Sequence, residues 1–358
     1  MTVERYDSIR GAEKCLRETE GNGSSSQTFS VLRAVERCFW RCLPYTAMRH
    51  PRYATTCAWA RRRPFRVYVA RDEKGTVLCA PLHRDSDGEW SVVAGEIVEL
   101  DFVDFLYARR SLSELSEAFR AVMHKMFEDG IRRIGWRYLE SDGITASLLR
   151  DWPHSVNETF QNVRIVFPDG LDGYMRALSV NARANMNKAR NRLRRDGKNV
   201  SFTFRSSVGI GDGMEGREVR AQMRRCRSVY VERQKSRYRN RGLLARLYFL
   251  HGSYVALSVP GEGAFVATLE IDGSVASYME GYVNTARKAL EVPRIAMNAE
   301  FGRYSPGRLL IAEAVAWLSA NSDVRTIDLC RGDERYKLDL GGILYATESV
   351  QACTEVPA

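Results

Sequence analysis

The stretch "RYSPGRLLIAEAVAWL", from Arg303 to Leu318, predicts a helix with an open amino-terminal end. Ser305 is a favoured N-cap residue, Pro306 fits the first helical position, and Gly307 leaves the backbone uncovered. Apolar residues then recur at helical spacing, at Leu309, Leu310, Ala314, Val315 and Leu318. One face must therefore be buried, while unpaired N–H groups at the start favour an anion. The alternative is an ordinary capped core helix without a ligand.

The composition is typical of a globular protein with room for two domains. The chain has 358 residues, of which 44% are hydrophobic and 27% are charged. No apolar run is long enough to span a bilayer, and acidic residues interrupt any signal-peptide pattern near the start. The eight cysteines include no C-x-x-C pair. We therefore expect a cytoplasmic protein with free thiols and no metal site.

The net charge of +10 predicts an anionic partner, which is a nucleic acid, a phosphorylated cofactor or an acidic membrane face. Basic residues concentrate at 183–198 and 217–241, in the second half of the chain. The first run belongs to a helix expected over 174–195, whose basic face is either solvated or binds phosphate. Arg183, near the apolar stripe of this helix, is our candidate for phosphate binding.

The order of apolar patterns predicts a mixed α/β fold in two domains. We expect a flexible leader over 1–28, a first domain over 29–170 and a second over 171–358. The elements expected in the first domain are helices at 29–42, 46–60 and 112–129, a hairpin around Gly75, and strands near 131–139 and 163–167. Those expected in the second are helices at 174–195 and 215–235, a hairpin at Asp272–Gly273, the helix quoted above and a strand over 324–330. A sheet with this order opens around a ligand at strand ends beside a helix start.

Polar residues at strand ends supply the candidate catalytic groups. Asp328 lies within an apolar strand, where a carboxylate needs either an ion-pair partner or a chemical role. In the loop that follows, Tyr336 is a candidate to protonate a leaving thiolate, and Lys337 to bind phosphate or polarise a carbonyl. Glu280, after the apolar run "ASYM", is the preferred general base, with an ordinary edge-strand carboxylate as the alternative.

Three segments together resemble a known group of enzymes. They are "YMRALSVNARANMNKARNRLRRDG", "YSPGRLLIAEAVAWL" and "IDLCRGDERYKLDLGG", which span about 171–345. In this order they are similar to the CelD/BcsL group of acetyltransferases in the GNAT superfamily. The resemblance implies two tandem GNAT-like units, related to the FemAB-type aminoacyl transferases, with one acyl-donor site in the second unit.

The resemblance also implies which residues hold the donor. In GNAT enzymes the turn before this helix cradles the pyrophosphate of coenzyme A with backbone N–H groups. The corresponding residues here are Tyr304, Ser305, Pro306, Gly307, Arg308 and Leu309, and we add Arg331 and Arg183 as donor-binding candidates.

The expected function is therefore acyl-CoA-dependent N-acyl transfer, with acetyl-CoA or another acyl-CoA as donor. The acceptor is an amine of a small molecule, sugar or amino acid, which attacks the thioester directly. One alternative is a FemAB-like transferase that takes its acyl group from aminoacyl-tRNA, which the basic helices favour. The other is a non-catalytic nucleic-acid-binding protein on a GNAT scaffold.

Overall fold

The chain folds into two compact units, each described here by itself. The structure is a computed structural model that describes residues 1–7, 65–84, 88–92, 104–108, 110–206, 216–237, 264–284 and 287–355. Unit 1 comprises Met1–Phe160 and Ala346–Ala358, and unit 2 comprises Gln161–Tyr345. No described helix is long and apolar enough to cross a membrane.

Unit 1 is a mixed sheet with the helix α5 packed against its first hairpin. Its elements are β1 (Thr2–Tyr6), β2 (Phe65–Asp72), β3 (Gly75–Arg84), β4 (Trp90–Val92), β5 (Leu106–Tyr107), α5 (Leu112–Glu128), β6 (Arg133–Glu140), α6 (Ile144–Leu149) and β7 (His154–Val166). The strands of this unit lie in the order β1-β2-β3-β4-β6. Six apolar side chains of α5 are buried, because they recur at the spacing that places them on one helix face.

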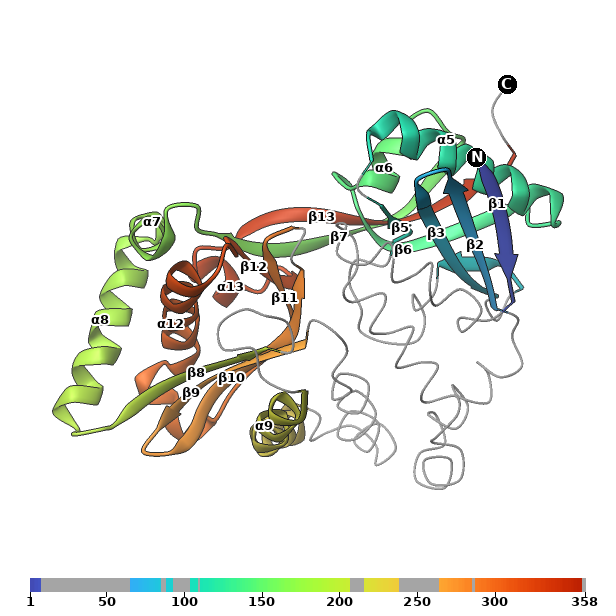
Figure 1. Cartoon of the computed structure of the whole chain (residues 1–358). Helices are drawn as coiled ribbons and strands as arrows, with labels where there is room; N and C mark the ends of the chain where they lie inside the picture. The colour runs from blue at the N-terminus through green and yellow to red at the C-terminus, as the bar shows by residue number, and fades with distance from the viewer. Residues whose placement is uncertain are drawn as a thin grey trace, which may run out of the picture. The chain divides into compact units, whose positions relative to one another are not determined.

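Unit 2 is a twisted sheet with helices on both faces (Figure 1). Its elements are α7 (Gly170–Ala177), α8 (Val180–Arg195), β8 (Val200–Ser206), α9 (Gly216–Arg237), β9 (Ala264–Ile271), β10 (Ser274–Asn284), β11 (Ala289–Met297), the 3-10 helix η2 (Ala299–Tyr304), α12 (Pro306–Asn321), β12 (Thr326–Arg331), α13 (Arg335–Asp339) and β13 (Ile343–Cys353). The end of β7 joins this sheet, whose order is β7-β12-β11-β10-β9-β8.

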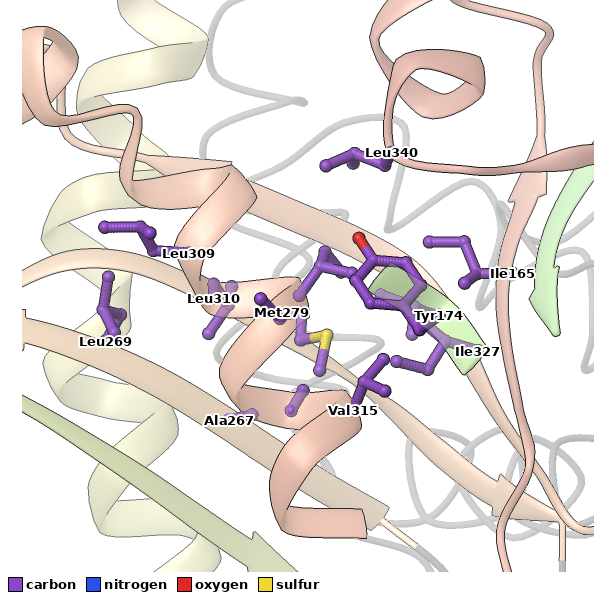
Figure 2. Packing of buried hydrophobic residues seen from close by; sticks show 14 of the residues in the cluster. Ile165, Tyr174, Ala267, Leu269, Met279, Leu309, Leu310, Val315, Ile327 and Leu340 are labelled. Atoms are coloured by element: carbon purple, nitrogen blue, oxygen red, sulfur yellow. The ribbon is translucent and has the colours of Figure 1, made fainter. Parts of the chain in front are cut away.

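The core of unit 2 lies between α12 and the sheet (Figure 2). Leu309, Leu310 and Val315 of α12 pack with Leu269 and Met279 of the hairpin. Each fully buried apolar side chain of this size contributes about 1.5–3 kcal/mol, so this packing supplies much of the stability of the unit. A separate cluster forms on the other face, where α9 covers β9, β10 and β11. One face of the β9–β10 hairpin is therefore covered by α12 and the other by α9.

The two units repeat one order of elements. With β5, α9 and η2 left aside, unit 1 runs β1, the hairpin β2–β3, β4, α5, β6, α6 and β7, and unit 2 runs β8, the hairpin β9–β10, β11, α12, β12, α13 and β13. In both, a parallel pair flanks the helix, β4 with β6 and β11 with β12. The last strands are exchanged, because the end of β7 pairs with β12 and the end of β13 pairs with β6.

Several elements differ from their predicted form. The single helix expected over 174–195 is two helices, because the hydroxyl of Ser179 accepts the Ala182 N–H at 3.1 Å and starts α8 there. Part of the expected leader is ordered as β1, which pairs with β2. The return of residues 346–353 to unit 1 differs from a continuous second domain over 171–358. The helices expected at 29–42 and 46–60, and residues 8–28 of the leader, lie outside the described residues.

Unit 1 contains a buried chain of hydrogen bonds. The Asp104 carboxylate accepts from the Phe105 N–H at 2.6 Å and from the Thr145 hydroxyl, which lies 2.5 Å from the Tyr107 hydroxyl. Burial raises the pKa of Asp104 to about 7, against the lowering effect of these hydrogen bonds. Between about pH 4 and pH 7, the Asp104 carboxyl group is therefore protonated in the folded unit and ionised in the unfolded chain.

We predict that the stability of unit 1 falls as pH rises from about 4 to about 7. In that window the folded Asp104 keeps a proton that the unfolded chain releases, so unfolding becomes easier by about 2–4 kcal/mol. Asp104→Asn should remove this slope in urea unfolding, whereas Asp151→Asn, at an exposed position, should keep it. An unchanged slope in Asp104→Asn would show that another group titrates.

Candidate functional site

The parallel strands β11 and β12 part after three residue pairs. Ala289–Glu291 pair with Thr326–Asp328, and neither strand pairs with the other beyond this point. Six residues of β11 and three of β12 continue past the last pair. The carboxyl ends of parted parallel strands are a general position for ligands in α/β sheets.

A bulge in β11 lies at the point where the strands part. The pairing of β10 with β11 shifts between Glu280 and Tyr282, opposite Glu291 to Arg294. Pro293 within this segment has no N–H to donate to a ladder, which confines proline to bulges and edges. On β10, a side chain at Gly281 would overlap the carbonyl oxygen of Glu291, so only glycine admits the bulged backbone. Pro293 and Gly281 together allow β11 to turn away from β12.

Helix α12 begins just beyond the end of β11, and its start has no side-chain cap. Ser305 stands at the N-cap position but adopts a left-handed conformation with φ 49°, and its side chain makes no capping bond. The prediction that Ser305 caps the helix was therefore wrong, because the left-handed backbone replaces the extended one that a capping side chain needs. Pro306 is buried at the first position, and a Cβ added at Gly307 would meet no atom within 4 Å. The first turn is open at Gly307.

The equivalent helix of unit 1 has the opposite arrangement. The Ser111 hydroxyl accepts the Glu114 N–H of α5 at 3.3 Å, and the Glu114 carboxylate accepts the Ser111 N–H at 2.9 Å. This capping box places a carboxylate of the chain itself at the positive end of α5. The first turn of α12 has no acidic residue. Of these two helix starts, α12 is therefore the one suited to an external anion.

The loop after β12 is held by Lys337, the residue that the sequence predicted to bind phosphate or polarise a carbonyl. Its Nζ is buried and donates to the carbonyl oxygens of Arg331 at 2.5 Å, Gly332 at 3.1 Å and Cys330 at 3.4 Å. It also forms an ion pair with Glu334 at 3.0 Å. Cys330 has φ 57°, so this loop has an unusual backbone that the lysine stabilises. In this geometry Lys337 positions the loop.

Asp328 is buried and hydrogen-bonded on both oxygens. Its Oδ2 accepts the Tyr345 hydroxyl at 2.6 Å, and its Oδ1 accepts the Cys330 N–H at 2.8 Å. Arg308, which follows the start of α12, forms its ion pair with Asp339 at 3.4 Å. Asp328 thus ties the end of β12 to β13 and to the loop.

The remaining predicted residues lie at different depths around the start of α12. Tyr336, in α13, is 37% exposed, and Leu309 is buried in the core. Arg308 donates to the Asp339 carbonyl at 3.3 Å, which places α13 beside the first turn of α12. Arg331 is partly exposed at the end of β12.

Two of the predicted donor-binding residues have partners within the protein. The Tyr304 hydroxyl donates to Asp196 at 2.9 Å and so fixes η2 to the end of α8. Arg183 Nη1 donates to the carbonyl oxygens of Met175, Arg176 and Leu178, at 2.6–3.2 Å. Arg183 therefore satisfies the last carbonyls of α7, which a helix end leaves unpaired.

Glu280 lies under α9, on the sheet face opposite α12. Its Oε1 accepts from Arg294 Nη1 at 2.7 Å, and both side chains are buried. Arg294 stacks on the ring of Tyr230 in α9, 4.2 Å from the centroid. Burial raises the pKa of Glu280, and Arg294 opposes that shift. The second oxygen, Oε2, has no hydrogen-bond partner among the described residues.

Three residues of this site were not singled out from the sequence. Arg294 is the partner of Glu280, and Gly281 and Pro293 permit the bulge. The proline in "EVPRIAM" was the available signal, since proline inside an apolar strand indicates a bulge or an edge. Arg294 had no such signal, because its pairing depends on the register of β10 and β11.

Comparison with known proteins identifies the fold of unit 2. Residues 180–338 match the family Acetyltransf_6, an acetyltransferase (GNAT) domain. This stretch of unit 2 is therefore similar to a GNAT acetyltransferase domain. The predictions of a mixed α/β fold and of an acyltransferase enzyme are confirmed, and the repeated order of elements in the two units agrees with the predicted tandem GNAT-like units. None of the curated proteins matches the chain.

Solved structures extend the likeness over both units. FemX is 10% identical, with a TM-score of 0.57, and the match covers 97% of each chain. The C-terminal domain of a protein assigned as a lysylphosphatidylglycerol synthetase from Agrobacterium fabrum is 11% identical, with a TM-score of 0.54, over 97% of this chain and 92% of that one. A Bacteroides thetaiotaomicron protein of unknown function is 9% identical, with a TM-score of 0.50, over 99% and 100%. At these identities the likeness concerns the fold.

We predict that Lys337→Met destabilises unit 2 by about 2–4 kcal/mol in urea unfolding, because three backbone carbonyls lose their buried donor. Lys288→Met, at a side chain that is 60% exposed, should change stability by less than about 0.5 kcal/mol. Equal, small effects of the two changes would contradict the positioning role of Lys337.

Proposed function

We propose that the chain is an acyl-CoA-dependent N-acyltransferase, with acetyl-CoA as the first donor to test. The observation that carries this proposal is the open, uncapped start of α12 beside the parted ends of β11 and β12. A helix start of this kind binds phosphate through backbone N–H groups and the helix dipole. The GNAT domain match over residues 180–338 supports a donor site in this unit.

The proposed donor lies between the parted strands. Its pyrophosphate meets the first turn of α12, at Gly307 and Arg308, on one face of the sheet. The pantetheine arm passes between β11 and β12, and the thioester reaches toward the α9 face. Glu280 and Arg294 lie on that face, beside the unpaired part of β11. In this arrangement the pyrophosphate end of the donor lies at the start of α12 on one face of the sheet, and the thioester end lies near Glu280 on the other face.

Glu280 is the proposed general base. Its buried position raises its pKa, and Oε2 has no protein partner among the described residues. The acceptor nitrogen attacks the thioester carbonyl carbon, Glu280 takes the proton that this nitrogen loses, and the carbon–sulfur bond breaks. Tyr336, exposed on α13 just after the carboxyl end of β12, is the proposed proton donor to the leaving thiolate. Lys337 and Asp328 hold the loop and strand end around this reaction.

The proposed acceptor is an amine of a small molecule, sugar or amino acid, and we place the protein in the cytoplasm. The three segments quoted in the sequence analysis favour the CelD/BcsL group within the superfamily. A second candidate is a transferase that uses aminoacyl-tRNA as donor. The fold likeness to FemX over 97% of the chain favours it, because FemAB-type enzymes take their acyl group from that donor.

We predict that acetyl-CoA raises the melting temperature by a few degrees and that Gly307→Trp abolishes this rise. The indole would fill the space over the first turn without straining the free protein, because the position is open. Gly302→Trp is the matched control, since a side chain is also unobstructed there. A rise that persists in Gly307→Trp would place the donor elsewhere.

We also predict that Glu280→Gln lowers the rate of acetyl transfer about 10²–10⁴-fold and leaves the thermal shift with acetyl-CoA intact. The rate is followed by release of free CoA with an amine selected from a panel of amino sugars and amino acids. Glu313→Gln, on a partly exposed surface carboxylate, serves as the control. An unchanged rate in Glu280→Gln would assign the base to another group.

A further inference from the structure

Helix α8 carries an unusual surface. Its sixteen residues, "VNARANMNKARNRLRR", include six arginines and lysines and no acidic residue. Its apolar side chains face the core of unit 2, at Ala182, Met186, Ala189 and Leu193. The opposite face is exposed, and Figure 1 shows α8 at the outer edge of this unit.

The exposed face consists of cations and amides. Asn181, Lys188, Asn191 and Arg195 are spaced by seven, three and four residues, so they form one stripe along the helix, about 21 Å long. We call this stripe, with the neighbouring exposed residues Asn185, Asn187 and Arg194, the α8 basic face.

Few charges of this face are neutralised within the protein. Arg195 Nε pairs with Asp196 at 3.2 Å, yet its side chain is 70% exposed. Arg194 donates to the Asn191 amide oxygen at 3.1 Å. Lys188 forms no ion pair with any described residue. Lys188 also lies four residues before Arg192, a like-charge spacing that costs about 0.2–0.5 kcal/mol on a helix. A polyanion on this surface would relieve that repulsion.

The α8 basic face leads toward the start of α12. Arg192 donates to the Arg303 carbonyl at 2.8 Å, so the last turns of α8 lie against η2. Arg190 pairs with Glu313 of α12 at 3.1 Å. A chain of phosphates along α8 would therefore approach the helix start at which we place the donor.

We propose that the α8 basic face is a docking surface for the backbone of an RNA. Arginine and lysine neutralise phosphates, while asparagine amides hydrogen-bond phosphate and sugar oxygens, including the 2′-hydroxyl. A membrane surface fits less well, because an interfacial helix inserts an apolar face and that of α8 is already buried. The acyl-CoA reaction does not require this surface, whereas an aminoacyl-tRNA donor would use it, so the inference goes beyond the first proposed function and is tested separately from it.

The test is binding of a fluorescein-labelled RNA hairpin to the full chain, measured by anisotropy over a series of salt concentrations. The variant Lys188→Gln/Arg194→Gln/Arg195→Gln removes three charges from the α8 basic face. The matched control, Arg133→Gln/Arg150→Gln/Lys288→Gln, removes three exposed charges elsewhere. Melting temperatures, with and without acetyl-CoA, are recorded for all three proteins.

We expect the α8 variant to bind the hairpin at least tenfold more weakly than the unmodified protein. The slope of log K against log salt concentration should become about 2–3 less steep, because three cations no longer contact phosphates, while the control variant changes little. Both variants should keep the thermal shift with acetyl-CoA, so failure of the donor proposal would appear separately, as no shift in any protein. Equal weakening in both variants, or equal binding of a DNA hairpin or of phosphatidylglycerol vesicles through the same residues, would overturn the proposal. Loss of the acetyl-CoA shift in the α8 variant alone would overturn it too, by making α8 part of the CoA site.

Discussion

The separation of β11 from β12 is the constraint on which the candidate site depends. Parallel strands that stayed paired to their ends would leave no passage between the two faces of the sheet. Here the pairing stops at Glu291 and Asp328, where Pro293 withholds a donor and Gly281 makes room for the bulge. Asp328 and Lys337 then fix the end of β12 and its loop through buried hydrogen bonds. The end of β12 is therefore held in place where its pairing with β11 stops.

The two units show how one topology serves different purposes. Both place a helix after a hairpin and a short strand, next to a parallel partner. In unit 1 the start of α5 is occupied by the carboxylate of Glu114. In unit 2 the start of α12 is uncapped and Gly307 is open. The side chains at the helix start thus decide the difference: the N–H groups of α5 are capped by its own residues, whereas those of α12 are available to a ligand.

Much of the fold, and less of the site, was accessible from the sequence. Apolar periodicity and the Asp272–Gly273 turn located α5, α12 and the β9–β10 hairpin, because these elements depend on local patterns. The roles of Lys337 and Arg183 were not accessible, since both side chains bind backbone carbonyls that only the folded chain brings near them. The same holds for Arg294, whose partner Glu280 is set by strand register, and for the exchange of β7 and β13 between the units.

The central claim is that the donor's phosphates bind the first turn of α12. The most direct measurement is the amide spectrum of protein labelled with ¹⁵N at glycine and arginine, recorded with and without acetyl-CoA. The account predicts that the largest shifts occur at the N–H groups of Gly307 and Arg308, as phosphate oxygens accept from them. Binding of acetyl-CoA that leaves these two amides unchanged would contradict it.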